Sequence, residues 1–209
     1  MSNINLELGP GSFYFLTGPS GAGKSTFLKL LYMELAATTG RVRLFGKDTR
    51  RMNRNEIARN RRRIGVVHQD CQFLDHLTLA TNVALPLTVS GRDPEAQSDN
   101  LRELLAWVGL NDRVNAYPPQ LSGGEKQRAA LARAVIMAPD LILADEPTGN
   151  VDWEMSQRLL TLMIELNKMG KTIIIATHDL QLIRTAKTHV NARVLRVKDK
   201  TVEFAGADL

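Results

Sequence analysis

The sequence predicts an α/β protein whose parallel sheet is covered by helices on both faces. The chain has 209 residues, of which 44% are hydrophobic and 23% charged, an ordinary globular composition that suffices for one domain. Short runs of residues that are apolar on both sides alternate with helical stretches, which is typical of strands buried in a parallel sheet. The middle third lacks such runs. We therefore expect a single domain, residues 1–209, with a helical subdomain over residues 70–138 inserted into its core.

The first element is a buried strand, Phe13–Thr17, which is apolar, rich in aromatic residues and bounded by glycines. The other predicted elements follow in chain order: a helix over Lys24–Ala36, a half-exposed strand over Arg41–Phe45, a strand over Ile64–Val67, helices over Leu101–Val108 and Gly123–Ala138, a strand over Leu141–Asp145, a helix over Met155–Lys168 and a strand over Thr172–Thr177. Leucines 28, 31 and 35 should share the buried face of the first helix. We also expect a strand around Ile4–Leu8.

Several classes of protein are disfavoured by simple features. One cysteine, Cys71, cannot form an internal disulfide, and we expect it to be a small core residue. No apolar run approaches the roughly 18 residues that cross a bilayer. The first basic residue is Lys24, so there is no charged region of a secretory signal. The four histidines show no metal-ligand spacing. We therefore expect a cytoplasmic protein.

A glycine-rich segment between the first strand and the first helix matches the pattern G-x-x-x-x-G-K-[ST]. Its residues are Gly18, Pro19, Ser20, Gly21, Ala22, Gly23, Lys24, Ser25 and Thr26. Glycines let successive N–H groups point at phosphate oxygens, and the helix N-terminus adds the positive end of a dipole. Lys24 should reach the β- and γ-phosphates of a nucleotide, Ser25 should ligate Mg²⁺, and Thr26 should bind the α-phosphate. The strand and helix around the pattern favour this over an ordinary glycine turn.

The apolar strand Leu141–Asp145 delivers two acids at its carboxyl end, the edge at which open α/β sheets bind ligands. Asp145 should hold Mg²⁺, through water because Mg²⁺ gives up water reluctantly. Glu146 is the candidate that polarises an attacking water. By itself the pair could mark only a strand leaving the core, but together with the glycine-rich segment it predicts a nucleotide site.

A second candidate anion site opens the helix Gly123–Ala138. Its residues are Ser122, Gly123, Gly124 and Glu125, within the run Leu121–Arg128. The alternative is purely structural, because Ser122 is a good N-cap and Glu125 three residues later completes a capping box.

These motifs together resemble the ATP-binding-cassette ATPases over essentially the full chain. The resemblance implies a P-loop NTPase with a RecA-like parallel core and an inserted helical signature subdomain. It places Gln69 at the family's Q-loop, contacting Mg²⁺ and the attacking water, and His178 at the switch that contacts the γ-phosphate. The segment Gly149–Asp152, which includes Asn150, falls at the D-loop, with Asp152 reaching across to a second subunit.

The family also begins with a strand and an aromatic residue that stacks on adenine, about two dozen positions before the phosphate loop. Only 17 residues precede Gly18, so the resemblance implies a truncated N-terminal β subdomain. Phe13 and Tyr14 lie within the strand that enters the loop and are poorly placed to stack on the base.

The resemblance further implies a homodimer that sandwiches two ATP molecules, with Mg²⁺ in each site. One subunit would give Gly18–Thr26, Gln69, Asp145, Glu146 and His178, and the other Ser122–Glu125 and Asp152. Within the family the motifs are most similar to the cell-division ATPases. Their role would be septal wall remodelling through an integral membrane partner docked near Gln72–Leu79, at the inner face of the cell membrane. The lipoprotein-releasing and macrolide-export ATPases are the alternative.

Two rivals from other classes are a soluble cassette acting in DNA repair or on ribosomes, and a nucleotide-binding scaffold that hydrolyses poorly. The chain is too short for the first, which carries a long coiled coil or two cassettes. Intact Lys24, Asp145, Glu146 and His178 argue against the second.

A basic patch covers Arg41–Arg63, where ten basic and two acidic residues give a net charge of +8 against −3 for the rest of the chain. Three interpretations are open: a face near an acidic partner or anionic lipid headgroups, a plain solvated face, and nucleic-acid binding. The last is disfavoured because no aromatic residues are interleaved with the charges, so we expect no nucleic-acid partner.

Overall fold

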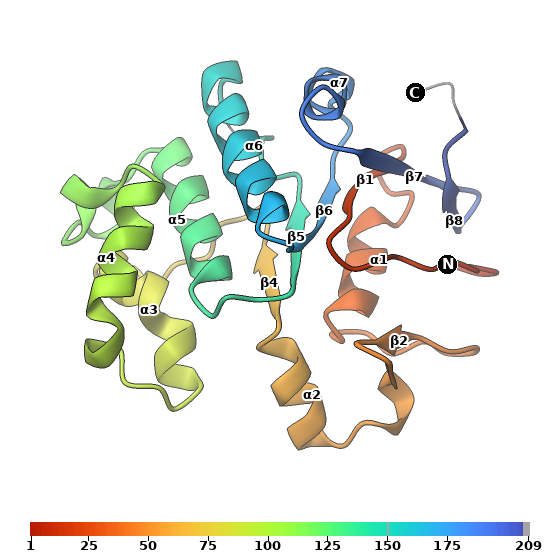
Figure 1. Ribbon diagram of the computed structural model, residues 1–209, viewed down its shortest axis with the longest axis horizontal. Coiled ribbons are helices and arrows are strands. Elements are labelled where there is room, and N and C mark those ends of the chain that lie inside the picture. Colours follow the sequence, from red (N-terminus) through yellow and green to blue (C-terminus); the bar gives the residue numbers. More distant parts are fainter. Residues whose placement is uncertain (150, 207–209) are drawn as a thin grey trace.

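The computed structural model describes residues 1–149 and 151–206 and has a central sheet covered on both faces by helices (Figure 1). The strands are β1 (Phe13–Thr17), β2 (Arg43–Leu44), β3 (Lys47–Asp48), β4 (Ile64–Val67), β5 (Leu141–Asp145), β6 (Thr172–Ala176), β7 (Ala192–Lys198) and β8 (Thr201–Phe204). The α-helices are α1 (Lys24–Leu31), α2 (Arg54–Arg61), α3 (Leu79–Val89), α4 (Ser98–Trp107), α5 (Gly123–Val135), α6 (Trp153–Lys168) and α7 (Leu180–Lys187). Short 3₁₀ turns are η1 (Thr49–Arg51), η2 (Glu95–Gln97), η3 (Asn111–Arg113) and η4 (Pro118–Gln120).

The main sheet in the described residues has six strands in the order β4-β5-β6-β1-β7-β8. The pairs from β4 to β7 are parallel, and β8 returns antiparallel to β7. The α/β class predicted from the buried apolar strands is confirmed. The small hairpin of β2 and β3 forms a separate antiparallel sheet.

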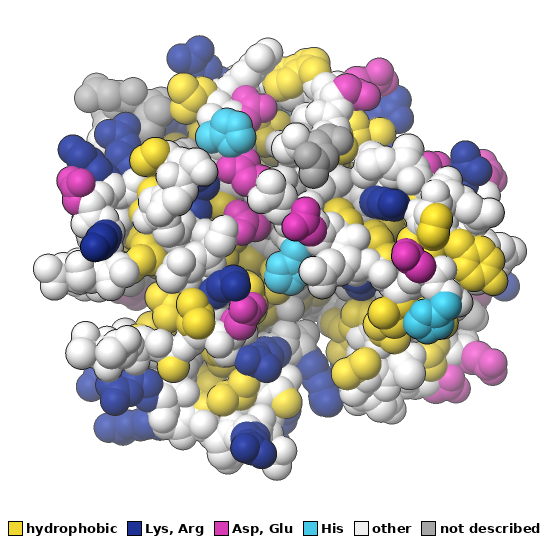
Figure 2. Space-filling model, turned by 180° about the vertical axis from the view of Figure 1, so that it is seen from behind, with side chains coloured by type: hydrophobic (Ala, Val, Ile, Leu, Met, Phe, Trp, Pro, Cys, Tyr) yellow, Lys and Arg dark blue, Asp and Glu magenta, His cyan; other side chains and the backbone are white. Residues whose placement is uncertain are grey.

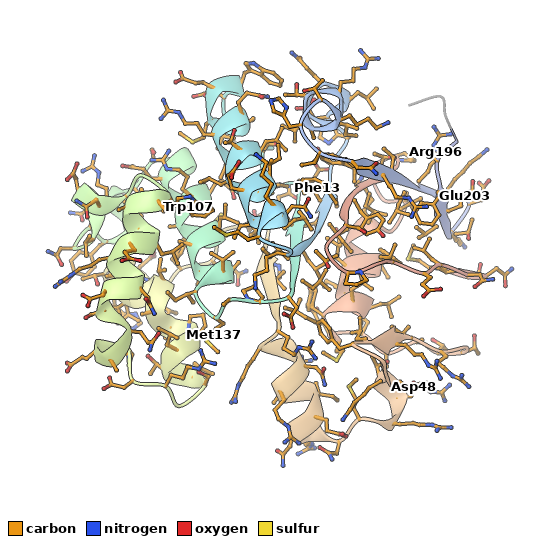
Figure 3. All side chains as sticks on the ribbon, in the orientation of Figure 1. Phe13, Asp48, Trp107, Met137, Arg196 and Glu203 are labelled. Carbon is orange, nitrogen blue, oxygen red and sulfur yellow. The ribbon has the colours of Figure 1, made fainter. Side chains whose placement is uncertain are left out.

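Strand β1 shows why the core has two faces. All five of its residues are buried, and successive side chains point to opposite sides of the sheet. Phe13 and Phe15 pack in the cluster that includes α5, α6 and α7, whereas Tyr14 and Leu16 pack in the cluster that includes α1. Figure 3 shows Phe13 inside the molecule near α6. Because Phe13 and Tyr14 are 1% and 0% exposed, neither can stack on a nucleotide base.

Residues 70–138, all of which the structure describes, contain α3, α4 and α5 and no strand. These helices lie together at one end of the sheet (Figure 1). They share a separate apolar cluster, which includes Leu79, Leu105 and Leu121. Helix α5 also packs against β4, so it joins this cluster to the core of the sheet.

Four predicted helices have boundaries that were wrong. Helix α4 starts at Ser98, three residues before the predicted Leu101, and ends at Trp107 with Val108 as its C-cap. Helix α1 ends at Leu31 rather than Ala36, because Met33 has a positive φ of 60°, and Leu35 is therefore exposed. Helix α5 ends at Val135, since Ala138 has a φ of 51° and precedes a proline, which disfavours helical backbone. Helix α6 starts two residues earlier than predicted, at Trp153, with Asp152 as its N-cap.

Two predicted strands also differ. The strand over Arg41–Phe45 is reduced to Arg43–Leu44, because Phe45 and Gly46 both take positive φ and turn the chain back into β3. No strand is assigned among residues 1–9, although Ile4, Leu6 and Leu8 are half-buried while the residues between them are exposed. Their side chains alternate as in a strand and pack on the core, but the backbone is not paired in a ladder.

Candidate active site

The candidate site lies along one edge of the sheet, where four adjacent parallel strands end. The order β4-β5-β6-β1 places the segments that follow these strands side by side. Gln69 follows β4, Asp145 ends β5, His178 follows β6, and Gly18 follows β1. The register aligns the strand ends, since Val67 pairs with Ala144 and Asp145 with Ala176. The sheet therefore assembles the predicted residues from positions more than a hundred residues apart.

The glycine-rich loop between β1 and α1 has a backbone conformation that suits an anion. Gly18, Gly21 and Gly23 have φ values of 152°, 74° and 110°, which side-chain-bearing residues rarely adopt. A Cβ at Gly18 would lie 2.7 Å from the Val197 carbonyl oxygen, so only glycine fits there. Gly23 is the N-cap of α1, and among the residues that the structure describes no side chain caps this helix. The N–H groups of its first turn are thus free of side-chain acceptors and can bind an anion.

Lys24 is folded back over this loop. Its Nζ donates to the carbonyl oxygens of Gly18 at 2.9 Å and Pro19 at 3.4 Å, and it lies 3.9 Å from Glu146 Oε1. Ser25 and Thr26 follow in the first turn of α1, and both are exposed. The ammonium group therefore stands at the mouth of the cradle, where a phosphate oxygen would replace the weaker carbonyl acceptors.

Glu146 and His178 are brought together by the pairing of β5 with β6. His178 Nδ1 lies 3.0 and 3.1 Å from the two carboxylate oxygens of Glu146. The Glu146 side chain is only 12% exposed, whereas that of His178 is 77% exposed. Glu146 has a positive φ of 46°, and its N–H donates to the Ala176 carbonyl at 2.9 Å. This backbone turn directs the Glu146 carboxylate toward Lys24 and His178, while Asp145 stays in the strand as its half-buried last residue.

The segment Ser122–Glu125 forms the start of α5. Ser122 Oγ accepts from the Glu125 N–H at 3.2 Å, and Glu125 Oε2 accepts from the Ser122 N–H at 2.8 Å, a complete capping box. Arg113 also binds Glu125, at 2.8 Å. These donors, first the Ser122 N–H, lower the pKa of Glu125. Ser122 and Gly123 are exposed, so the turn presents a free surface beside the capping contacts.

Asp152 lies at the start of α6, whose Met155 packs beside this turn. It caps α6, accepting from the Met155 N–H at 2.8 Å, and a Cβ on Gly124 would lie 3.2 Å from the Met155 side chain. Within the described part of the chain, no hydrogen bond or ion pair joins Ser122–Glu125 or Asp152 to Gly18–Thr26. The predicted site residues thus form two groups within one chain. Asn150, at the predicted D-loop, lies outside the described residues.

Gln69 is exposed, and the loop that follows it is held by three side chains that the sequence did not identify as functional. They are Asn82, Gln127 and Arg133, from α3 and α5. A polar residue within an apolar helical stretch, such as Asn82 before Val83 and Ala84, is the signal that could have indicated a buried anchor. Cys71 is half-buried rather than a full core residue, and burial raises the pKa of its thiol to about 11.

His68, between β4 and Gln69, packs its ring edge-on against Tyr32, with 5.9 Å between ring centroids. Burial, and next the nearby Arg133 charge, lower the pKa of His68. No cluster of three metal-binding side chains occurs in residues 1–149 and 151–206. Across the same residues, none of the helices combines the length and apolarity needed to cross a membrane.

Comparison with known proteins identifies the family. The model of the ABC transporter family matches residues 1–149. The cell division ATP-binding protein FtsE of Haemophilus influenzae is 45% identical over 184 residues, which are 88% of this chain and 84% of that protein. FtsE of Bacillus subtilis is 41% identical over 192 residues, which are 92% of this chain and 84% of that protein.

Solved structures agree with this assignment. A dimeric post-hydrolysis state of an ATP-binding cassette bound to ADP and Pi superposes with a TM-score of 0.87 and 35% identity, covering 97% of this chain and 88% of that one. A dimeric ABC transporter cassette gives the same values. The glycine cradle, the paired Glu146 and His178, and these relatives lead to one conclusion: the chain belongs to the ATP-binding subunits of ABC transporters and is an ATPase with the P-loop NTPase fold.

Proposed function

We propose that this ATPase drives a membrane complex of cell division, of the FtsE type, and that two copies close around two ATP molecules. The relatives named FtsE support the cell-division role. The separation of the site into two groups supports the dimer, because Ser122–Glu125 and Asp152 lie apart from the phosphate loop of their own chain. In this proposal each site combines the sheet edge of one subunit with the start of α5 and Asp152 of the other.

The sheet edge supplies most of the chemistry. Gly18–Thr26 and Lys24 hold the phosphates, and phosphoryl transfer then depends mainly on positioning and charge stabilisation. Glu146 accepts a proton from the attacking water, and His178, which already contacts this carboxylate, contacts the γ-phosphate. Closure of the dimer with ATP, and its reopening after hydrolysis, would be the mechanical output.

The residues at this edge also fit Mg²⁺. The Ser25 hydroxyl, the Asp145 carboxylate and the Gln69 amide are oxygen donors, the kind that Mg²⁺ prefers, and each is exposed or only half-buried. With few protein ligands the ion would keep water and phosphate oxygens in its shell. When bound, it would neutralise charge that develops on the phosphates.

The membrane partner would dock in a groove beside the loop that follows Gln69. The groove has a volume of about 540 Å³, and its lining residues are Cys71, Gln72, Phe73, Leu74, Asp75, Leu85, Pro118, Lys126 and Arg133. Its lining combines the apolar Phe73 and Leu74 with charged residues such as Asp75 and Lys126, a mixture suited to an amphipathic helix. We propose an FtsX-like integral membrane protein as the occupant, coupling ATP hydrolysis to septal wall remodelling and holding the ATPase at the inner face of the cell membrane.

Retention on membranes tests this docking. Leu74→Arg should abolish retention on membranes that contain the FtsX-like protein of the same genome, while ATP binding stays within twofold. Trp107→Arg is the matched control, because Leu74 and Trp107 are similarly exposed, at 43% and 37%, and both lie in residues 70–138. Equal retention of the two variants would contradict the groove. Capture by membranes carrying a lipoprotein-releasing or macrolide-export partner instead would favour that alternative function.

We also propose that the basic patch Arg41–Arg63 faces anionic lipid. Figure 2 shows Lys and Arg side chains gathered at its lower left, the side on which α2 and the β2–β3 hairpin lie. Two arginines of the run Arg61–Arg63 hold other segments in place. Arg61 donates to the carbonyl oxygens of Tyr32 and Met33 beyond the end of α1, and Arg63 binds Asp140 at 2.6 Å while stacking on Phe45.

The arginines to reverse are therefore Arg54, Arg59 and Arg62, which are exposed and form no ion pair in the described part of the chain. At about 1 kcal/mol per basic residue near an anionic surface, three substitutions by glutamate should weaken binding to phosphatidylglycerol vesicles ~100-fold or more. Added salt should have a similar effect. The same reversal at Arg92, Arg102 and Arg184, outside the patch, serves as control. Equal binding by both triple variants would make the patch a solvated face.

A further inference from the structure

Gln127 connects the start of α5 to the backbone of Gln69. This residue lies five positions after Ser122 in the same helix and is only 3% exposed. Its Nε2 donates to the Gln69 carbonyl oxygen at 3.4 Å, and its Oε1 accepts from the Cys71 thiol at 3.1 Å. One buried amide thus holds the chain on both sides of Asp70.

The rest of the loop is fixed to the same helices. Arg133 of α5 donates to the Gln72 carbonyl and stacks on Phe73, with its guanidinium carbon 4.5 Å from the ring centroid. Asn82 of α3 is fully buried and bonds to the backbone of Leu74, Leu77 and Thr78. Residues 69–78 are therefore attached to α3 and α5 at each of these points.

Among these three side chains, Gln127 is the one that forms a hydrogen bond with Gln69 itself. Gln127 and Ser122 are separated by about one and a half turns of a continuous helix, so they move as one body. A shift of the Ser122–Glu125 turn would therefore move the Gln69 carbonyl with it. The hydrogen bond from Gln127 to the Gln69 carbonyl therefore connects the helix that begins at the Ser122–Glu125 turn to a residue of the sheet edge.

We infer that Gln127 is a positioning residue that sets the place of Gln69 according to the place of the Ser122–Glu125 turn. Because its side chain is buried and bonds to the Gln69 backbone, it acts through Gln69. The inference rests on the proposed role of Gln69 in hydrolysis. It adds that a partner subunit closing on Ser122–Glu125 shifts this turn, and that the Gln127 side-chain amide transmits the shift to Gln69 of the same chain.

A double-mutant cycle in ATP turnover tests this. Gln127→Met keeps the length of the side chain and removes both hydrogen bonds, and we expect turnover to fall at least tenfold with ATP affinity unchanged within twofold. In the Gln69→Ala background the same substitution should have no further effect, because the group that it positions is gone. A merely structural role would lower turnover equally in both backgrounds, which would overturn the inference.

Two further variants keep the result interpretable. Gln127→Glu retains the acceptor for Cys71 but cannot, as a carboxylate, donate to the Gln69 carbonyl. Its ATP turnover should therefore be as low as that of Gln127→Met. Normal turnover in Gln127→Glu would overturn the inference even if Gln127→Met failed to fold. Gln157→Met is the matched control, because Gln157 is half-buried in α6 and its Nε2 has no hydrogen-bond partner among residues 1–149 and 151–206. If Gln69→Ala alone kept normal turnover, the proposed role of Gln69 in hydrolysis would be wrong. If both single variants lost turnover and their losses added in the double variant, only the inference about Gln127 would be wrong.

Discussion

Replacing Glu146 by glutamine should separate ATP binding from hydrolysis. The two side chains have the same shape, so the amide oxygen can still lie 3.0 Å from His178 Nδ1 and the turn at Glu146 is kept. The amide cannot accept a proton from water. Removal of a general base typically costs 10²- to 10⁴-fold in rate, and at about 1.4 kcal/mol per factor of ten this raises the barrier by about 3–5 kcal/mol.

ATP binding should survive this change. Glu146 lies 3.9 Å from Lys24 in a site where both side chains are about one-tenth exposed, so its negative charge competes with phosphate for the ammonium group. Neutralising the charge should leave ATP affinity equal or higher. With hydrolysis blocked, ATP should then hold the protein as a dimer.

The assay combines Mg-ATP turnover, nucleotide affinity and light scattering after size exclusion with ATP. Glu103→Gln, the same change at an exposed position of α4, should behave as wild type in all three. A Glu146→Gln protein that turns over ATP near the normal rate and stays monomeric with ATP would refute the role given to Glu146.

Lys24→Ala should reduce ATP binding by the monomer, because it removes the charge facing the phosphates. Ser122→Arg should instead leave ATP binding by the monomer intact and abolish the ATP-dependent dimer. Titration calorimetry measures the first effect and size exclusion the second, and equal loss of monomer binding in both variants would contradict the assignment of Ser122 to the opposite site. Cys71 should react slowly with maleimide at pH 8. Its raised pKa of about 11 keeps the thiol protonated there, so labelling should be ~100-fold slower than for a free cysteine and should speed up as pH rises toward that value. Labelling at the rate of free cysteine would show that the thiol is not buried as the structure has it.

The strands and the glycine-rich loop could be predicted because their signals are local. Phe13–Thr17 is apolar on both faces, and Lys24 is the seventh residue of a pattern whose glycines permit the φ values seen at Gly18 and Gly23. The contact between Glu146 and His178 could not be derived from spacing, since it depends on β5 lying beside β6 and on the positive φ of Glu146. Glu146 was predicted from its place after the strand Leu141–Asp145, whereas His178 came from the family resemblance.

Helix ends and the roles of charged residues were harder to predict, because both depend on distant contacts. Nothing near Leu35 in sequence marks the turn at Met33, which is held by Arg61 from α2. The run Arg61–Arg63 looked like a uniform basic surface, yet Arg61 and Arg63 each bind another segment, and only for Arg62 does the described part of the chain show no such side-chain contact. The alternation at Ile4–Leu8 predicted correctly which side chains face the core. It predicted wrongly that the backbone pairs as a strand, because pairing requires a neighbouring strand that periodicity cannot reveal.

The capping box at Ser122 shows that a structural role and a functional role are compatible at one residue. The Ser122 hydroxyl accepts from the Glu125 N–H, which uses one of its lone pairs and leaves its hydrogen free to donate. A phosphate oxygen is an acceptor, so the hydroxyl can cap α5 and bind phosphate at the same time. Glu125 differs, because its carboxylate already accepts from the Ser122 N–H and Arg113 and would repel a phosphate. Its part in the proposed site is therefore to hold the turn in which Ser122 and the two glycines present their donors.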